Sequence, residues 1–197
     1  MRIYDITQEL FSGKVYPGDA VPSYNRVLKI SEGAPCNLTE LKLGAHNATH
    51  LDAPYHFYDN GKTIEQLDLF RCIGPCTVTS FEGKEQEAIN RILSKCRKRL
   101  LLKGNTEVTL EVAKLLNQHN ILLIGIEGQS VGPEDAPKAV HMELLGEEVV
   151  LLEGLVLAEV EEGEYFLSAA PLKLGGSDGA PCRAILISFD ETDTCNY

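Results

Sequence analysis

Residues 109–128, TLEVAKLLNQHNILLIGIEG, contain a helical pattern that is followed at once by a strand pattern. Thr109 is a suitable helix N-cap. The apolar side chains after it fall on one stripe at helical spacing, at Leu110, Ala113 and Leu116. The run ILLIGIEG at 121–128 is apolar and predicts a buried strand. This stretch therefore predicts a helix that leads directly into the core of a sheet.

The preceding segment repeats this succession. GKEQEAINRILSKCRKR, residues 83–99, predicts a helix, and the apolar run LLLKG at 100–104 predicts a buried strand. The helical spacing is carried by Ala88, Ile92 and Cys96. The basic cluster at 95–99 is expected at the helix end, where cations suit the helix dipole. A helix followed by an apolar strand, twice over, is typical of an α/β layer.

Both ends of the chain have strand patterns without helices between them. The predicted strands are RIYDI at 2–6, RVLKI at 26–30, CTVTSFEG at 76–83, VVLLEGLVLAEV at 149–160, EYFLSAAPLKL at 164–174 and CRAILISF at 182–189. No internal repeat or low-complexity linker divides the 197 residues. We predict an α/β fold with a mixed sheet, in a single domain that spans residues 1–197.

Composition excludes several classes of protein. A net charge of −11 argues against a nucleic-acid partner, because phosphate binding needs clustered basic residues. No apolar run approaches the roughly 18 residues of a membrane span, and residues 1–10 lack the apolar core of a signal peptide. We therefore expect a cytoplasmic protein without a membrane partner. Six scattered cysteines favour buried inert thiols, although Cys72 and Cys76 leave a redox or thiolate-metal module open.

Residues 44–57, GAHNATHLDAPYHF, contain three of the five histidines and one aspartate, all at even positions. They are His46, His50, Asp52 and His56. On an extended chain these side chains would share a face, and Pro54 argues against a helix. A straight strand would separate the outer two by roughly 33 Å, whereas metal ligands lie about 2.0–2.2 Å from the ion. The chain must therefore curl, most naturally at Gly44 and Pro54, if these residues bind a metal ion.

Two interpretations of this segment remain open. The side chains could be hydrogen-bonded polar residues of a turn, or ligands of zinc or manganese, which both accept imidazole and carboxylate. The density of histidine favours the metal site. Further ligands could come from His141 and from Glu153, an acid inside an apolar run that is costly to bury unless it is paired or coordinated. His119 closes a helix and is interpreted as structural.

HNATHLDAPYHF, residues 46–57, resembles the HxGTHxDxPxH signature of the cyclase family of metal-dependent hydrolases, which includes bacterial kynurenine formamidases. Further segments that resemble the family are VYPGD at 15–19, GIEGQSVG at 125–132, the pair His141 and Glu153, and GGSDGAPCRAILI at 175–187. The resemblance covers nearly the whole chain. It implies a swivelling β/β/α domain that assembles into homodimers or homotetramers.

Carried over by position, the resemblance implies a site for two divalent metal ions. Zinc is the expected metal, and manganese is the alternative. His46 and His50 would bind the first ion, and His141 the second. Asp52 and Glu153 would serve both ions.

The resemblance also assigns roles beside the metal ions. His56 would be a proton carrier and not a permanent ligand. Tyr16 falls where kynurenine formamidases have a Trp that contacts the aromatic ring of the substrate. Ala48 replaces a glycine of the signature, so the backbone there cannot use the glycine-only φ region, although ordinary extended values remain open to it.

The implied activity is hydrolysis of the C–N bond of an aryl formamide such as N-formylkynurenine, a small molecule of tryptophan catabolism. Metal-bound hydroxide would attack the acyl carbon, with His56 carrying the proton. Tyr16 in place of Trp leaves the substrate open, so a cyclic amide or lactone hydrolase resembling the isatin hydrolases is an alternative. A metal-binding protein without turnover is another.

Overall fold

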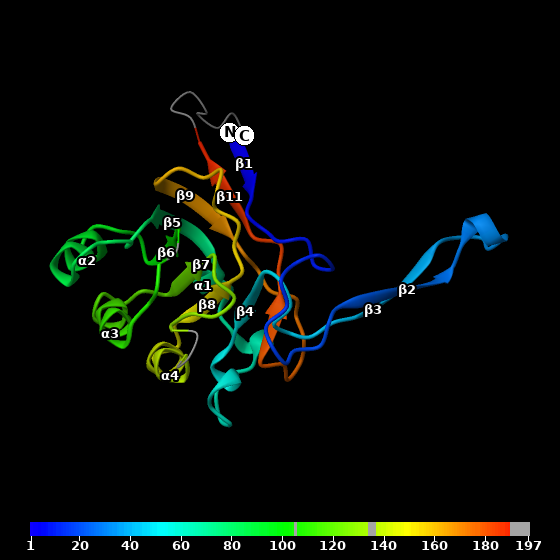
Figure 1. Ribbon diagram of the computed structural model, residues 1–197, viewed down its shortest axis with the longest axis horizontal. Coiled ribbons are helices and arrows are strands. Elements are labelled where there is room, and N and C mark those ends of the chain that lie inside the picture. The colour runs from blue at the N-terminus through cyan, green and yellow to red at the C-terminus, as the bar shows by residue number, and fades with distance from the viewer. Residues whose placement is uncertain (105, 134–136, 190–197) are drawn as a thin grey trace.

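A curved mixed sheet of nine strands forms the centre of the molecule (Figure 1). The computed structural model describes residues 1–104, 106–133 and 137–189. The strand order is β1-β11-β9-β5-β6-β7-β8-β4-β10. Strands β5 to β8 run parallel to one another, and the strands on either side of them are antiparallel. The predicted α/β fold with a mixed sheet is therefore confirmed.

The sheet strands lie close to most of the predicted apolar runs. They are β1 (Arg2–Asp5), β4 (His50–Asp52), β5 (Ile73–Thr79), β6 (Arg99–Leu102), β7 (Leu123–Ile126), β8 (Val150–Glu153), β9 (Gly163–Ser168), β10 (Gly179–Pro181) and β11 (Ile185–Ser188). The strand in the run at 149–160 is shorter than predicted. It ends at Glu153, because Gly154 has a φ of 70°. Strands β4 and β10 are three residues long and were not predicted as separate elements.

Three helices connect the parallel strands and cover one face of the sheet (Figure 1). They are α2 (Gln86–Leu93), α3 (Leu110–Gln118) and α4 (Lys138–Gly146), and a single turn, α1 (Leu69–Cys72), precedes β5. Alternate residues of β6 point to opposite faces, so Leu100 and Leu102 pack beneath the helices while Leu101 joins the core on the other face.

Helix α3 follows its sequence prediction. The Thr109 hydroxyl accepts a hydrogen bond from the Val112 backbone N–H at 3.3 Å, which caps the first turn. Ala113 and Leu116 on the predicted stripe are fully buried. The local pattern was sufficient here because the capping residue and the apolar stripe agree.

Helix α2 differs from its prediction. It ends at Leu93 and not near residue 99, and its buried side chains are Ile89 and Leu93, one position along from the predicted stripe. The basic cluster therefore lies past the helix end. Arg99 belongs to β6 and is buried, because its guanidinium donates to the backbone carbonyls of Phe70, Arg71 and Pro75.

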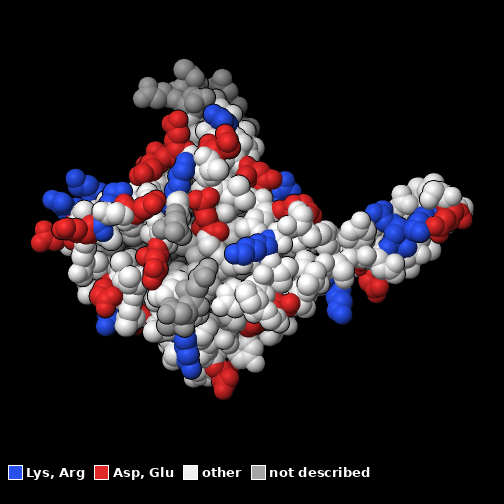
Figure 2. All heavy atoms as spheres, viewed as in Figure 1, with Lys and Arg blue, Asp and Glu red and all other residues white. Residues whose placement is uncertain are grey.

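Residues 21–42 form an arm that stands away from the rest of the molecule, which we call the body (Figures 1 and 2). The arm consists of β2 (Ser23–Leu28), a short 3-10 turn at Ile30–Glu32, and β3 (Leu38–Lys42), paired as a separate two-stranded sheet. Every residue of both strands is exposed. Among the described residues, no helix is long and apolar enough to cross a membrane.

Candidate metal centre

Two neighbouring strands bring distant parts of the chain together. β4 pairs antiparallel with β8, and the register places His50 opposite Glu153. Directly opposite residues of an antiparallel pair point to the same face, and so do residues two apart on one strand. The side chains of His50, Asp52 and Glu153 therefore share a face, and each residue is at most 3 % exposed.

His141 reaches the same face from helix α4. Its Nδ1–H donates to the Pro137 carbonyl at 2.9 Å, one turn earlier in the chain. Its Nε2 consequently faces the two acids, 3.4 Å from Glu153 Oε1 and 3.8 Å from Asp52 Oδ2. One ring nitrogen is thus fixed by the backbone while the other points to the carboxylates, which is the arrangement typical of a metal-binding histidine.

His50 is oriented in the same way. Its Nδ1–H donates to the Ala48 carbonyl at 2.9 Å, and its Nε2 lies 3.3 Å from Asp52 Oδ1 and 3.4 Å from Glu153 Oε2. Ala48 has a φ of 55°, in the left-handed region that residues with a Cβ rarely adopt. Ala48 therefore does not take the ordinary extended values that were open to it. The backbone takes the conformation that favours glycine, in the turn whose carbonyl holds the His50 ring.

His46 lies in the loop before β4 and contacts two carboxylates. Its Nδ1 is 2.8 Å from Asp52 Oδ1, and its Nε2 is 2.8 Å from Asp178 Oδ2. The oxygens of Asp52 are therefore divided, since Oδ1 faces His46 and His50 and Oδ2 faces His141. Glu153 is divided likewise, with Oε2 toward His50 and Oε1 toward His141.

The electrostatics of the cluster follow from burial opposed by mutual contacts. Burial disfavours the charged form of His46, but the hydrogen bond to Asp52 and the charge of Asp52 raise its pKa to about 9. The same balance, with Asp52 and Glu153 as partners, raises the pKa of His50 and of His141. Hydrogen bonds from His46 and His50 outweigh the burial of Asp52 and lower its pKa. The mutual contacts thus favour protonated histidines beside an ionised Asp52.

His56 lies at the end of a short 3-10 helix, Pro54–His56, that follows β4. The chain curls at Pro54, as predicted, and this brings His56 back beside His46, with ring centroids 4.1 Å apart. Its Nδ1–H donates to Asp178 Oδ2 at 3.0 Å, and its ring packs edge-on against Phe57 at 4.7 Å. The His56 side chain is 30 % exposed, so it can meet a ligand from solvent.

Asp178 is the functional candidate that sequence reasoning missed. It accepts hydrogen bonds from both His46 and His56 and lies 122 positions from His56 in the chain. Burial opposes its ionisation, but the hydrogen bonds and charge of His46, with the hydrogen bond from His56, lower its pKa. Its one signal in the sequence is its place in the segment 175–187 that resembles the family, where it carried no assigned role.

A cavity opens above these side chains. Its lining includes the three histidines 46, 50 and 56, His141, both buried acids, and also Tyr16, Asp19, Phe57, Gln129, Ser130 and Pro137. Tyr16 enters from a turn in which the Asp19 N–H donates to the Tyr16 carbonyl at 3.0 Å. Phe57 packs against the His141 ring at 4.7 Å. Aromatic rings therefore line the cavity beside the polar cluster.

The donor set fits divalent metal ions. Two ligand atoms about 2.0–2.2 Å from one ion lie roughly 3.0–3.5 Å apart, and the contacts of His50 Nε2 with Asp52 and Glu153, at 3.3 and 3.4 Å, fall in this range. Two groups place their ligand atoms within 4.8 Å of one another, namely His46, Asp52 and His56, and His50, Asp52 and Glu153. Asp52 belongs to both groups, so two neighbouring ions could share it. The first group includes His56, to which the resemblance gives a proton-carrying role, and neither group includes His141.

The other candidates lie apart from this cluster. His119 follows α3 and donates through Nε2 to Asn90 Oδ1 at 2.7 Å on the surface. Cys72 and Cys76 are fully buried, and burial raises the pKa of both thiols to about 12. Such thiols stay protonated, which argues against a thiolate-metal or redox role for this pair. Cys195 lies outside the described residues.

Comparison with known proteins gives consistent results. The sequence profile of a family described as "Putative cyclase" matches residues 4–99. The chain is 32 % identical over 199 aligned residues to a kynurenine formamidase of Bacillus thuringiensis subsp. konkukian, covering 92 % of this chain and 95 % of the relative. It is 35 % identical to a kynurenine formamidase of Polaromonas naphthalenivorans, covering 94 % and 91 %.

Solved structures show the same fold. A structure described as a potential metal-dependent hydrolase with cyclase activity superposes with a TM-score of 0.80 at 26 % identity, covering 96 % of this chain and 98 % of the other. An isatin hydrolase bound to the product analogue thioisatinate superposes with a TM-score of 0.79 at 18 % identity, covering 95 % and 92 %. The second likeness shows the fold alone.

Proposed function

Because the chain belongs to the cyclase family of metal-dependent hydrolases, we propose that residues 1–197 form one catalytic domain that hydrolyses the C–N bond of an aryl formamide. The proposed substrate is N-formylkynurenine, which would give formate and kynurenine. Relatives at 31–35 % identity that are named kynurenine formamidase support this choice. The observation that carries the proposal is the convergence of three histidines on Asp52 and Glu153 at a cavity with aromatic walls.

Two divalent ions are the proposed cofactors. Zinc is the preferred metal, and manganese is the alternative. His46 and His50 would hold one ion and His141 the other, with Asp52 and Glu153 serving both. The observed division of the carboxylate oxygens supports this assignment. Such ions, when bound, lower the pKa of a coordinated water toward about 7 and polarise a substrate carbonyl.

His56 is the proposed proton carrier. Asp178 accepts the Nδ1–H of His56, which fixes the tautomer and leaves Nε2 to exchange protons with the reactants. As the new C–O bond forms, Nε2 would take the proton of the attacking water. It would then give that proton to the amine nitrogen as the C–N bond breaks. Formamide and water thus become formic acid and amine, the formic acid releases a proton to solvent as formate, and His56 ends in its starting state.

Tyr16 is the proposed contact for the aromatic ring of the substrate, together with Phe57 on the cavity wall. Hydrolysis of a cyclic amide or lactone is the second candidate. It is favoured by the Tyr16 hydroxyl, which can donate and accept a hydrogen bond at the place where kynurenine formamidases have a Trp. This group could instead pair with a second carbonyl of a fused ring such as isatin.

Turnover of a substrate panel tests both candidates. The metal-loaded protein would be assayed with N-formylkynurenine, isatin and an aryl lactone, with zinc and with manganese, alongside metal content per chain. We expect the highest kcat/KM for N-formylkynurenine, its loss in His56→Ala, and no change in the control His119→Ala. A higher kcat/KM for isatin would favour the second candidate, and metal binding without turnover of any substrate would contradict both.

The proposed assembly is a homodimer or homotetramer, as the family resemblance implies. A small molecule is the only other proposed partner, in keeping with the cavity and the acidic chain.

A further inference from the structure

A second cavity, which we call the side cavity, adjoins the cavity above the metal ligands. Its volume is about 620 Å³. Tyr16, Gln129 and Ser130 line both cavities and form the wall between them. The other walls of the side cavity come from the segment before Tyr16 and from the segments that follow β6 and β7. A ligand that extends from the metal centre past Tyr16 therefore enters the side cavity.

The side cavity lies at the edge of the sheet where α/β proteins usually bind their ligands. β6 and β7 are parallel neighbours, and the side cavity is lined by Thr106 and Glu107 after β6 and by residues 127–130 after β7. Glu153 of the metal centre ends β8, which is the parallel neighbour of β7. Ligands of open α/β sheets bind outside the carboxyl ends of parallel strands. Both cavities thus belong to one ligand-binding edge.

The cavity above the metal ligands is small for a whole substrate. Its volume is about 180 Å³. Pockets for small molecules usually measure about 300–1,000 Å³, and the two cavities together fall within this range. A substrate whose reacting group lies at the metal centre would therefore place its remaining atoms in the side cavity.

Two side chains of opposite charge line the side cavity and are available to a ligand. Lys14 and Glu107 are both exposed, and within the described ranges neither side chain forms an ion pair or a hydrogen bond. Glu127 also lines the side cavity, but its carboxylate already accepts the N–H groups of Gly104 and Leu157 at 2.7 and 2.8 Å. The charges that a ligand would meet are therefore those of Lys14 and Glu107.

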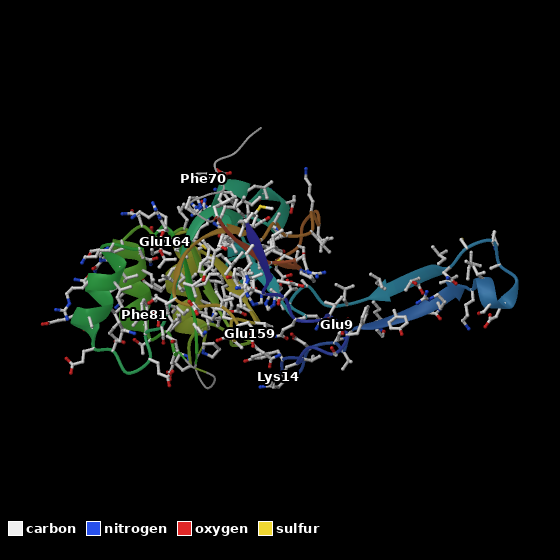
Figure 3. The ribbon with its side chains drawn as sticks, turned by 90° about the horizontal axis from the view of Figure 1, so that it is seen from above. Glu9, Lys14, Phe70, Phe81, Glu159 and Glu164 are labelled. Atoms are coloured by element: carbon white, nitrogen blue, oxygen red, sulfur yellow. The ribbon has the colours of Figure 1, made fainter. Side chains whose placement is uncertain are left out.

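A backbone contact holds Lys14 at the wall of the side cavity. The Gln129 side-chain amide donates to the Lys14 carbonyl at 2.5 Å, which joins the segment before Tyr16 to the loop after β7. The contact uses the backbone of Lys14 and leaves its ammonium group to a ligand. Lys14 lies on the opposite side of the body from Phe70 (Figure 3). Since Tyr16 is two residues further along, one contact positions both the proposed ring contact and the cation.

From these features we propose that the side cavity binds an amino-acid group at the far end of the substrate, with Lys14 pairing with its carboxylate and Glu107 with its ammonium group. This subsite rests on the proposed hydrolysis of an aryl formamide at the metal centre. It would select N-formylkynurenine, whose amino-acid tail is attached next to the formamide on the ring, over aryl formamides without a tail. Isatin has no such group to place there.

The pairing of a cation with an anion argues for a ligand group that carries both charges. An amino-acid group has an ionised carboxylate and a protonated amine at neutral pH. A tail with a carboxylate alone would pair with Lys14 and be repelled by Glu107, and a tail with an amine alone would be repelled by Lys14. Like charges placed together oppose binding, so a zwitterion is the group that complements both side chains.

Steady-state kinetics of the metal-loaded protein with three formamides tests the proposal. N-formylkynurenine carries both charges, and its deamino analogue keeps the carboxylate alone. The third substrate, 2-formamidoacetophenone, keeps the ring, the ketone and the formamide but has no tail, so its turnover reports on the metal centre alone. We expect the wild type to prefer N-formylkynurenine over 2-formamidoacetophenone by about tenfold or more in kcat/KM, since charged hydrogen bonds to the tail are lost.

Variants of the two charged residues assign the two ends of the tail. Lys14→Gln should lower the preference for N-formylkynurenine over 2-formamidoacetophenone by about fivefold to tenfold, mainly through KM, and Lys14→Arg should restore most of it. Glu107→Gln should lower kcat/KM for N-formylkynurenine but not for the deamino analogue. The charge-matched controls Glu87→Gln and Lys95→Gln change exposed residues on and just after α2, away from β4 (Figure 1), and should leave the preference unchanged.

The outcomes separate the subsite from the proposed function. Equal kcat/KM of the wild type for N-formylkynurenine and 2-formamidoacetophenone would overturn the subsite and leave the proposed function in place, and this comparison needs no variant. A preference that Lys14→Gln leaves unchanged would overturn the role of Lys14, and equal losses for the two substrates would do the same. Turnover of neither formamide by the metal-loaded protein would contradict the proposed function and the subsite with it.

Discussion

Replacing Asp178 by Asn removes the charge shared by His46 and His56 without changing the size of the side chain. In the structure Asp178 Oδ2 lies 2.8 Å from His46 Nε2 and 3.0 Å from His56 Nδ1. A hydrogen bond to a charged group is worth about 1.5–3 kcal/mol. The Asp178 side chain is 40 % exposed, so solvent screening reduces this to about 1–1.5 kcal/mol.

This loss should appear in two measurable quantities. At about 1.36 kcal/mol per tenfold in rate, the weakened orientation of His56 lowers kcat by about fivefold to thirteenfold. The weakened hold on His46 lowers metal affinity by about tenfold, the lower end of the range for partners of metal-binding histidines. The KM for the aryl substrate should change little, because Asp178 does not belong to the aromatic wall of the cavity.

Steady-state kinetics at saturating zinc, with metal affinity from competition against a chelator, separates the two effects. Asp178→Glu should recover part of kcat, since it restores the charge at a longer reach. Asp59→Asn, a change at an exposed carboxylate of the same kind, serves as the control and should leave both quantities unchanged. A kcat within twofold of wild type at saturating metal would refute the role of Asp178 in orienting His56.

Four further outcomes are expected. His56→Ala should retain metal but lose about 10²- to 10⁴-fold in kcat, and loss of the metal instead would make His56 a ligand. Ala48→Gly should raise the free energy of unfolding by about 0.5–1 kcal/mol in denaturant, because the strain of alanine at a φ of 55° exceeds the larger loss of chain entropy when glycine folds. A lower free energy of unfolding would show that the contacts of the Ala48 methyl group matter more. The metal-free protein should lose stability between about pH 6.5 and pH 9, because folding raises the pKa of His46 to about 9. The stabilisation of the folded state by protonated His46 is complete only below the pKa of the unfolded chain, so a melting temperature that rises over this window would contradict the prediction. Gly154→Ala should lower stability and metal affinity, since the added Cβ would meet the Ala48 carbonyl oxygen at 2.6 Å. In the control Gly163→Ala the nearest atom to the added Cβ is 3.7 Å away, so stability should fall much less, and equal losses in thermal unfolding would refute this.

Local patterns predicted much of the fold because the physical cause was local. The helix after Thr109 and the apolar strands of the sheet centre follow from capping, spacing and burial within a few residues. The end of α2 was misplaced because Arg99, although part of a basic cluster, is buried by carbonyls of residues 70, 71 and 75. That environment is created by packing between α1, β5 and β6 and has no local signature.

The residues of the candidate site also differ in whether the sequence could predict them. His46, His50, Asp52 and His56 could be selected from one short segment, and their family pattern pointed to His141 and Glu153. Asp178 could not be selected, because its contacts with two histidines arise where β10 pairs with β4 at the edge of the sheet. The conformation of Ala48 was missed for a different reason, since replacement of a glycine suggested that the backbone itself had changed.

The buried acids of this cluster need positively charged partners. Asp52 and Glu153 are almost without exposure, and two unpaired carboxylates would be too costly to bury side by side. The raised pKa values of His46, His50 and His141 favour the protonated rings, which pair with the acids. Divalent cations entering the folded site would replace those protons, so metal affinity should rise with pH. The same side chains therefore serve folding as ion pairs and the proposed chemistry as ligands, with the strand register His50↔Glu153 keeping them in place for both.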